Sequence, residues 1–188
     1  GEYGPVWHQS ALKENRQRAY DDFIAIAIDL IEKGITSKDH LGIEGRSNGG
    51  LLVGATFTQR PDLFNAVICG VPLLDMYRYD KLLAGASWVD EYGDPDNPEE
   101  WEFIRKYSPY QNLKKGTEYP EVFFYTSTKD DRVHPGHARK MAKKMTDMGS
   151  PIVYYENTEG GHAGTSNIDQ FSFLLALQLA YLEDKLMN

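Results

Sequence analysis

The pentapeptide Gly45-Arg46-Ser47-Asn48-Gly49 constrains this chain more than any other segment. It lies between a short apolar run at 41–44, typical of a buried strand, and a helical pattern that extends from 49 to 59. A Gly-x-Ser-x-Gly turn in this context exposes the serine hydroxyl at the carboxyl end of the strand, and we expect side chains at either glycine to collide with neighbouring backbone. The helix that follows favours a developing negative charge at its N-terminus. The alternative is a glycine-rich turn with a structural serine, but the strand-turn-helix context favours a nucleophile at Ser47.

Apolar strands and helical segments alternate along the chain. Strands are predicted at 41–44, 66–71, 121–126 and 152–155, and helices at 17–33, 49–59, 99–106, 136–148 and 168–185. The strands are almost continuously apolar, a pattern typical of parallel strands buried on both faces. The segments 1–16 and most of 72–119 are predicted to be irregular. The fold class is therefore α/β, an α/β-hydrolase-like parallel sheet of about four strands with helices on both faces.

Composition and charge narrow the class of function. The 188 residues carry a formal charge of −8, which argues against nucleic acid or an anionic membrane as a partner. No apolar stretch is long enough to span a membrane. A single cysteine, Cys69, and few histidines in metal-binding spacing predict neither an internal disulfide nor a metal site, and we expect no cofactor. Because no signal peptide opens the chain, the cytoplasm is the expected compartment, with the periplasm and secretion as alternatives.

A serine nucleophile requires a histidine base, and His162 is the best candidate. It lies in a glycine-rich loop, 158–164, directly after the last predicted strand, where such a base is expected. Two of the other four histidines precede Ser47, against the chain order serine, acid, histidine. The other two flank the start of a predicted helix, where surface positions and helix capping are expected. In chain order these four are His8, His40, His134 and His137.

The acid that orients the base is expected after the third predicted strand. Asp130 and Asp131 both follow that strand at its carboxyl end, and either carboxylate could hold the imidazole in the correct tautomer. A solvated turn or a helix cap is the alternative for such a pair. The position favours one of the two as the acid, and the sequence leaves open which one it is.

Three more segments carry recognisable motifs in addition to the serine turn. The turn itself continues from Gly49 as Gly-Gly-Leu-Leu. The three segments are Gln59-Arg60-Pro61-Asp62-Leu63-Phe64, Asp130-Asp131-Arg132-Val133 with Pro135, and Gly160-Gly161-His162. Together with the opening residues 1–8, they resemble the prolyl oligopeptidase family of serine peptidases. The resemblance covers essentially the whole chain, and the motifs are highly specific in combination.

The resemblance implies a role for each matching residue. Ser47 becomes the nucleophile, His162 the base and Asp130, the first of the pair, the acid. The backbone N–H of Asn48 becomes a donor to the oxyanion, and Arg132 corresponds to the arginine that holds a substrate carbonyl.

The resemblance also implies a pocket for a proline ring. Trp88, Tyr92 and Val133 correspond to its lining, and Leu73 stands where the family tends to have a smaller apolar residue, which narrows the site. The alternative for Trp88 and Tyr92 is a pair of core aromatic residues in an irregular segment. The implied function is hydrolysis of short peptides after proline through an acyl-enzyme. A peptidase or esterase of other specificity in the same fold, and an inactive self-associating fragment, are the alternatives.

The resemblance further implies that residues 1–188 form the C-terminal part of a peptidase catalytic domain. The family's propeller domain and several early strands precede the matching region, as do a tyrosine donor to the oxyanion and a phenylalanine of the proline pocket. We therefore expect weak or no activity from the chain alone, since one lost donor typically costs ~10²–10³ in rate. Without upstream strands, the strand at 41–44 becomes an unpaired edge, and we expect a homo-oligomer formed through it.

Overall fold

A four-stranded parallel sheet forms the centre of the computed structural model, which describes residues 2–187. The strands lie side by side in chain order: β1 (Gly42–Arg46), β2 (Ala66–Gly70), β3 (Val122–Ser127) and β4 (Ile152–Asn157). Every neighbouring pair is parallel. The α/β class and the four strands predicted from the sequence are therefore confirmed, with strand bounds that differ by one or two residues.

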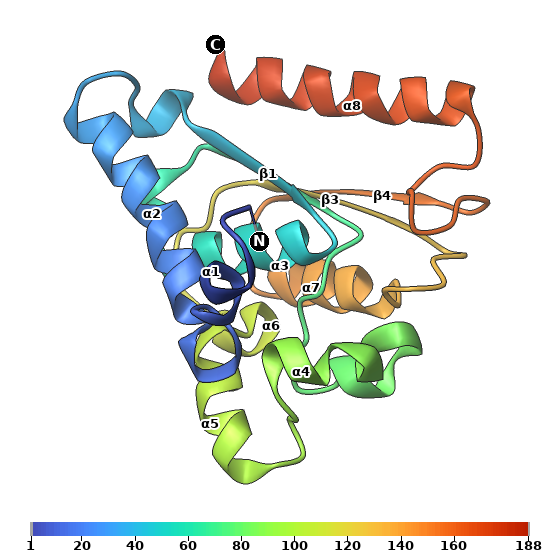
Figure 1. Ribbon diagram of the computed structural model, residues 1–188. Helices are drawn as coiled ribbons and strands as arrows, with labels where there is room; N and C mark the ends of the chain where they lie inside the picture. The colour runs from blue at the N-terminus through green and yellow to red at the C-terminus, as the bar shows by residue number, and fades with distance from the viewer. Residues whose placement is uncertain (1, 188) are drawn as a thin grey trace.

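Helices cover both faces of the sheet (Figure 1). On one face, α3 (Asn48–Gln59) packs on β1 and β2, and α7 (Gly136–Asp147) packs on β3 and β4. On the other face lies α8 (Ile168–Leu186), which contacts β2. The long helix α2 (Gln17–Glu32) packs against α3. These four helices confirm the predicted layers.

The alternation of side chains along β2 explains the two apolar layers. Val67 and Cys69 join the cluster beneath α3 and α7, whereas Ala66 and Ile68 join the cluster beneath α8. All five residues of β2 are buried, as expected for a strand covered on both faces. Apolar packing thus stabilises both faces of the sheet, and the loops that follow the strands lie at its carboxyl edge.

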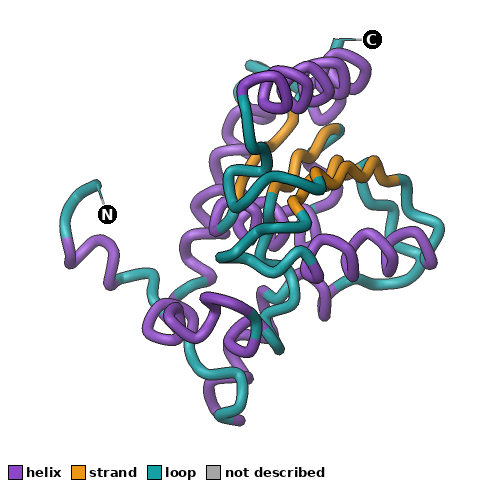
Figure 2. The backbone as a smooth tube through the Cα atoms, turned by 90° about the vertical axis from the view of Figure 1, so that its right-hand side faces the viewer, coloured by secondary structure: helices purple, strands orange, loops and turns teal. Residues whose placement is uncertain are grey.

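The segments predicted to be irregular contain short helices. The chain forms α1 (Pro5–Gln9), α4 (Val89–Tyr92) and α6 (Pro109–Asn112) in addition to the predicted helix α5 (Pro98–Tyr107). Their few turns give no sustained periodicity, so the sequence pattern did not reveal them. Figure 2 shows α1 standing to one side of the body, and none of its residues is buried.

Among the helices of residues 2–187, none combines the length and the apolar character needed to cross a membrane.

Strand β1 forms one edge of the sheet, as the sequence indicated. Its outer side is paired by no other strand of the described residues. An open edge of this kind is a template for pairing with another chain. Self-association through this edge stays a prediction.

The turn after β1 leaves no room for a side chain at one glycine of the pentapeptide, as expected, but it does leave room at the other. A Cβ at Gly45 would lie 2.1 Å from the carbonyl oxygen of Gly49. A Cβ at Gly49 would meet nothing within 4 Å, so the expected collision there was wrong. The second tight position is Gly50, whose Cβ would lie 2.6 Å from Cβ of Pro72. The turn is therefore closed by contacts of Gly45 and Gly50.

Two alanine substitutions test this packing. Gly45→Ala should destabilise the chain by more than about 3 kcal/mol, because the backbone of the turn must move to admit the methyl group. Gly49→Ala, in the first turn of α3, should change the free energy of unfolding by no more than about 1 kcal/mol. Urea unfolding of both variants checks this, and equal effects would contradict the description of the turn.

Candidate active site

Ser47 occupies a strained backbone position between β1 and α3. Its φ is 57° and its ψ is −117°, a combination that residues other than glycine rarely adopt. The conformation is held by the backbone, because Ser47 N–H donates to the carbonyl of Gly70 at 2.9 Å and Leu51 N–H donates to the carbonyl of Ser47 at 3.1 Å. The strain presents the hydroxyl at the carboxyl edge of the sheet.

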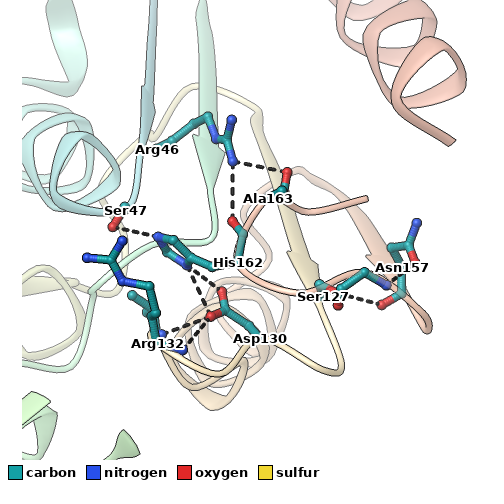
Figure 3. Close-up of polar contacts among 10 residues, drawn as sticks. Arg46, Ser47, Ser127, Asp130, Arg132, Asn157, His162 and Ala163 are labelled. Carbon is teal, nitrogen blue, oxygen red and sulfur yellow. Dashed lines mark hydrogen bonds and ion pairs between the residues drawn. The ribbon is translucent and has the colours of Figure 1, made fainter. Parts of the chain in front are cut away.

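The structure brings Ser47, His162 and Asp130 into one hydrogen-bonded chain (Figure 3). Nε2 of His162 lies 3.0 Å from Oγ of Ser47. Nδ1 of the same ring lies 2.9 and 3.0 Å from the two carboxylate oxygens of Asp130. Asp131 is exposed, whereas the side chain of Asp130 is completely buried. Of the two carboxylates that the sequence left open, the structure places Asp130 against the imidazole.

The carboxylate of Asp130 is fixed by the loop that carries it. Its Oδ1 accepts hydrogen bonds from the backbone N–H groups of Arg132 and Val133, each at 2.9 Å. The loop therefore fixes the direction of the group that faces His162.

Hydrogen bonds connect the loop that carries His162 to the serine turn. The guanidinium of Arg46 donates to the carbonyl oxygens of His162 and Ala163, at 3.3 and 3.0 Å. At the start of this loop, Oδ1 of Asn157 accepts from the N–H groups of Glu159 and Gly160. Sequence reasoning missed Arg46, although it stands directly beside the serine. Its side chain lies within hydrogen-bonding distance of the loop that carries His162 because the carboxyl ends of β1 and β4 lie on the same edge of the sheet.

A cavity of about 280 Å³ opens beside Ser47. It is lined by His8, Ser47, Asn48, Leu73, Trp88, Glu91, Tyr92 and Arg132. Four of the five residues expected to bind substrate are among them. Val133 is not among the lining residues, and it lies in the buried apolar cluster that also contains Leu73 and Tyr92.

Sequence reasoning missed a polar group at this cavity. Glu91 lies between Arg16 and His8, with Oε1 at 2.5 Å from Nη1 of Arg16 and Oε2 at 3.2 Å from Nε2 of His8. The hydroxyl of Tyr92 donates to Oδ1 of Asn48 at 2.7 Å. Burial raises the pKa of Tyr92, so this hydroxyl keeps its proton and remains a donor. These residues come from separate segments, and no local pattern could have joined them.

With this geometry established, comparisons with known proteins place the chain. The model of the prolyl oligopeptidase family matches residues 1–188. The chain belongs to the prolyl oligopeptidase family. It is 58% identical over 188 residues to an uncharacterized peptidase of Sinorhizobium fredii. The matched region covers 100% of this chain and 26% of that protein.

Two further similar proteins have names that describe an activity. A prolyl endopeptidase of Elizabethkingia miricola is 43% identical over 187 residues, covering 93% of this chain and 26% of that protein. A solved structure described as a post-proline cleaving enzyme from Rickettsia typhi superposes with a TM-score of 0.96 at 41% identity, covering 100% of this chain and 27% of that one. The chain thus spans about a quarter of the length of these prolyl oligopeptidase relatives.

One acidic cluster of this family member is formed by residues that are not among those lining the cavity. Asp80, Asp94 and Asp96 bring carboxylate oxygens within 4.8 Å of one another. The ammonium group of Lys81 pairs with Asp80 at 3.1 Å and with Asp96 at 2.5 Å. A cation of the chain itself therefore already neutralises part of this cluster.

His137 differs from its expected surface position. Its side chain is buried, and Nδ1 accepts hydrogen bonds from the backbone N–H groups of Leu74 and Asp75, at 3.3 and 3.0 Å. Burial lowers the pKa of His137 to about 4, although the nearby Asp75 carboxylate opposes this shift. His134, by contrast, caps the helix as expected, since its Nδ1 accepts from Gly136 N–H at 2.9 Å. The apolar face of α7 includes Met141 and Met145, and His137 stands one helical turn before Met141 on that face, so the periodicity was a signal that could have located it.

The buried His137 makes stability depend on pH. It is neutral in the folded chain down to about pH 4, whereas the unfolded chain binds this proton below its ordinary pKa of 6.5. Its contribution is therefore complete above about pH 6.5 and is lost as the pH falls toward 4, by about 3 kcal/mol in all. Urea unfolding at about pH 7.5 and about pH 5 should show about 2 kcal/mol of this loss in the wild type and a smaller loss in His137→Gln. Equal losses in both proteins would show that another group is responsible.

Proposed function

We propose that this chain carries the catalytic machinery of a serine peptidase that hydrolyses short peptides after proline. The observation that carries the proposal is the continuous contact from Ser47 Oγ through His162 to the buried Asp130 carboxylate. Because the chain spans about a quarter of its relatives, the activity of the whole protein is part of this proposal.

In the proposed mechanism, Ser47 is acylated by the substrate. Oγ attacks the carbonyl carbon of the scissile bond while Nε2 of His162 accepts the hydroxyl proton. The carbonyl oxygen becomes an oxyanion and accepts a hydrogen bond from the N–H of Asn48. As the first residue of α3, Asn48 has no partner for this group within the helix. Asp130 stabilises the imidazolium that forms.

Breakdown of the tetrahedral intermediate completes the cycle. The C–N bond breaks, and His162 returns its proton to the leaving amine, which departs and leaves the acyl group on Ser47. Water then attacks the acyl carbon while His162 accepts a proton from it. The ester bond breaks, Oγ of Ser47 regains a proton from His162, and the acid product is released. No cofactor enters any of these steps.

The cavity supports proline as the residue on the acyl side of the cleaved bond. Trp88 and Tyr92 contribute aromatic side chains to the lining, against which the compact ring of proline can pack. Leu73 contributes an apolar side chain to the same lining. The guanidinium of Arg132 opens on the same cavity and can donate to a substrate carbonyl. Relatives described as prolyl endopeptidases support the same preference.

Labelling with a fluorophosphonate tests the assignment of the nucleophile. The wild-type chain should be labelled at Ser47, and Ser47→Ala should abolish labelling, with exposed Ser87→Ala as the matched control that retains it. Asp130→Asn should slow labelling by about 10⁴-fold, because the imidazole then adopts the wrong tautomer. Labelling that persists in Ser47→Ala would refute the proposed nucleophile.

The same chain, offered peptides and esters, decides between the alternatives. Faster turnover of peptides with proline before the cleaved bond supports the proposal, whereas faster turnover after lysine or arginine, or of simple esters, favours another specificity. The absence of any stoichiometric burst from the chain alone would favour an inactive fragment.

A further inference from the structure

Arg16, at the start of α2, places a buried guanidinium directly behind the candidate site. Only 8% of the residue is exposed. One nitrogen, Nη2, donates to Oδ1 of Asn48 at 2.7 Å, and another, Nη1, donates to Oε1 of Glu91 at 2.5 Å. The guanidinium also lies over the ring of Tyr92, 5.1 Å from its centroid. A single side chain thus joins the serine turn to the helix that forms the cavity wall.

The planar geometry of the guanidinium suits this position. It presents several donors in a fixed fork, so it can hold two acceptors at set directions while its face stacks on an aromatic ring. Burial by itself lowers the pKa of Arg16, but the neighbouring Tyr20, Tyr92 and Glu91 more than reverse this, and the pKa is raised overall. Arg16 therefore stays charged, and the Glu91 carboxylate balances it.

Asn48 connects this network to the reacting atoms. Its side-chain oxygen accepts from both Arg16 and the hydroxyl of Tyr92, each at 2.7 Å. A side chain held from two sides restrains its own backbone, including the N–H that is the proposed oxyanion donor. Since a donor must lie where the oxyanion forms, a small rotation of this peptide weakens the stabilisation.

Tyr92 connects the same network to the substrate pocket. Its ring lines the cavity on one side, while its hydroxyl and ring face are held by Asn48 and Arg16. Glu91, the preceding residue, is held by Arg16 and in turn contacts His8 at the cavity mouth, at 3.2 Å. The pocket wall and the oxyanion donor therefore share one anchor.

We propose that Arg16 is a positioning residue that fixes the Asn48 N–H and the Tyr92 wall together, so that chemistry at Ser47 is coupled to occupation of the pocket by a ring. This inference rests on the proposed function. It assigns to Arg16 no contact with substrate, since its action passes through Asn48 and Tyr92.

The test compares Arg16→Met with Arg18→Met, an exposed arginine on the same helix. Two fluorophosphonates are used, one with a proline ring on the acyl side and one with a plain alkyl chain. For each variant, active-site titration gives the labelled fraction, and the rate constant is measured per active site. Arg16→Met should lower this rate constant by about 10-fold or more and should reduce the preference for the ring-bearing probe. Arg18→Met should leave both unchanged.

A purely structural role gives a different result. If Arg16 only stabilises the fold, Arg16→Met lowers the labelled fraction, while the rate constant per active site and the preference between probes stay at wild-type values. That outcome overturns the inference. Arg16→Lys, which keeps the charge without the fork, should give an intermediate rate constant if positioning is the cause.

A double-mutant cycle tests whether Arg16 acts on the reaction through Asn48. Asn48→Ala keeps the backbone N–H but removes the oxygen that Arg16 holds. If Arg16 acts through Asn48, the two substitutions together should slow labelling little more than either alone. Fully additive effects would show that Arg16 does not act through Asn48 and would overturn that part of the inference.

A binding measurement separates this inference from the proposed function. In Ser47→Ala with Trp7 and Trp101 replaced by Phe, fluorescence of the cavity residue Trp88 reports the binding of an acyl-proline amide without any reaction. Arg16→Met in that background should weaken binding by about 10-fold, and unchanged affinity overturns the role at the pocket. If the wild type binds the amide but no probe labels Ser47, the proposed function fails while the pocket role is still decided. If the wild type neither binds nor is labelled, both are overturned.

Discussion

The contact between the Asp130 carboxylate and Nδ1 of His162 is the interaction on which the candidate site depends. In the proposed mechanism this contact keeps a proton on Nδ1, so that Nε2, 3.0 Å from Oγ of Ser47, presents its lone pair to the hydroxyl. The carboxylate can do this while buried because the N–H groups of Arg132 and Val133 hold one of its oxygens. The short loop after β3 therefore fixes the position of the carboxylate that faces a ring in another loop.

Parallel strand order is what lets three distant residues meet. β1, β3 and β4 all point the same way, so their carboxyl ends lie on one edge of the sheet. Ser47 follows β1, Asp130 follows β3, and His162 lies in the loop that follows β4. The same edge allows Arg46 to fasten the histidine loop and opens the cavity beside the serine. Arg16, at the start of α2, likewise connects that helix to α3 through Asn48 and to α4 through Glu91.

Much of the fold could be predicted because its signals are local. Apolar runs located the strands, and the serine turn identified Ser47. The residues by themselves left open the choice between Asp130 and Asp131, and only the resemblance to the family selected Asp130, since adjacent carboxylates look alike until the backbone turn buries one of them. The roles of Arg16 and Glu91 were missed for a related reason, because an ion pair between distant segments leaves no pattern in either. The steric constraint at Gly50 rather than Gly49 likewise arises from contact with Pro72, which only the folded chain provides.

The central claim is that Asp130 holds the Nδ1 proton of His162 in a hydrogen bond, and proton NMR of the chain in water tests it most directly. A proton shared between an imidazole nitrogen and a buried carboxylate is strongly deshielded and exchanges slowly with water. The account predicts one such far-downfield resonance in the wild type, coupled to ¹⁵N of His162 and absent from Asp130→Asn. Its absence from the folded wild type, or its survival in Asp130→Asn, would contradict the account.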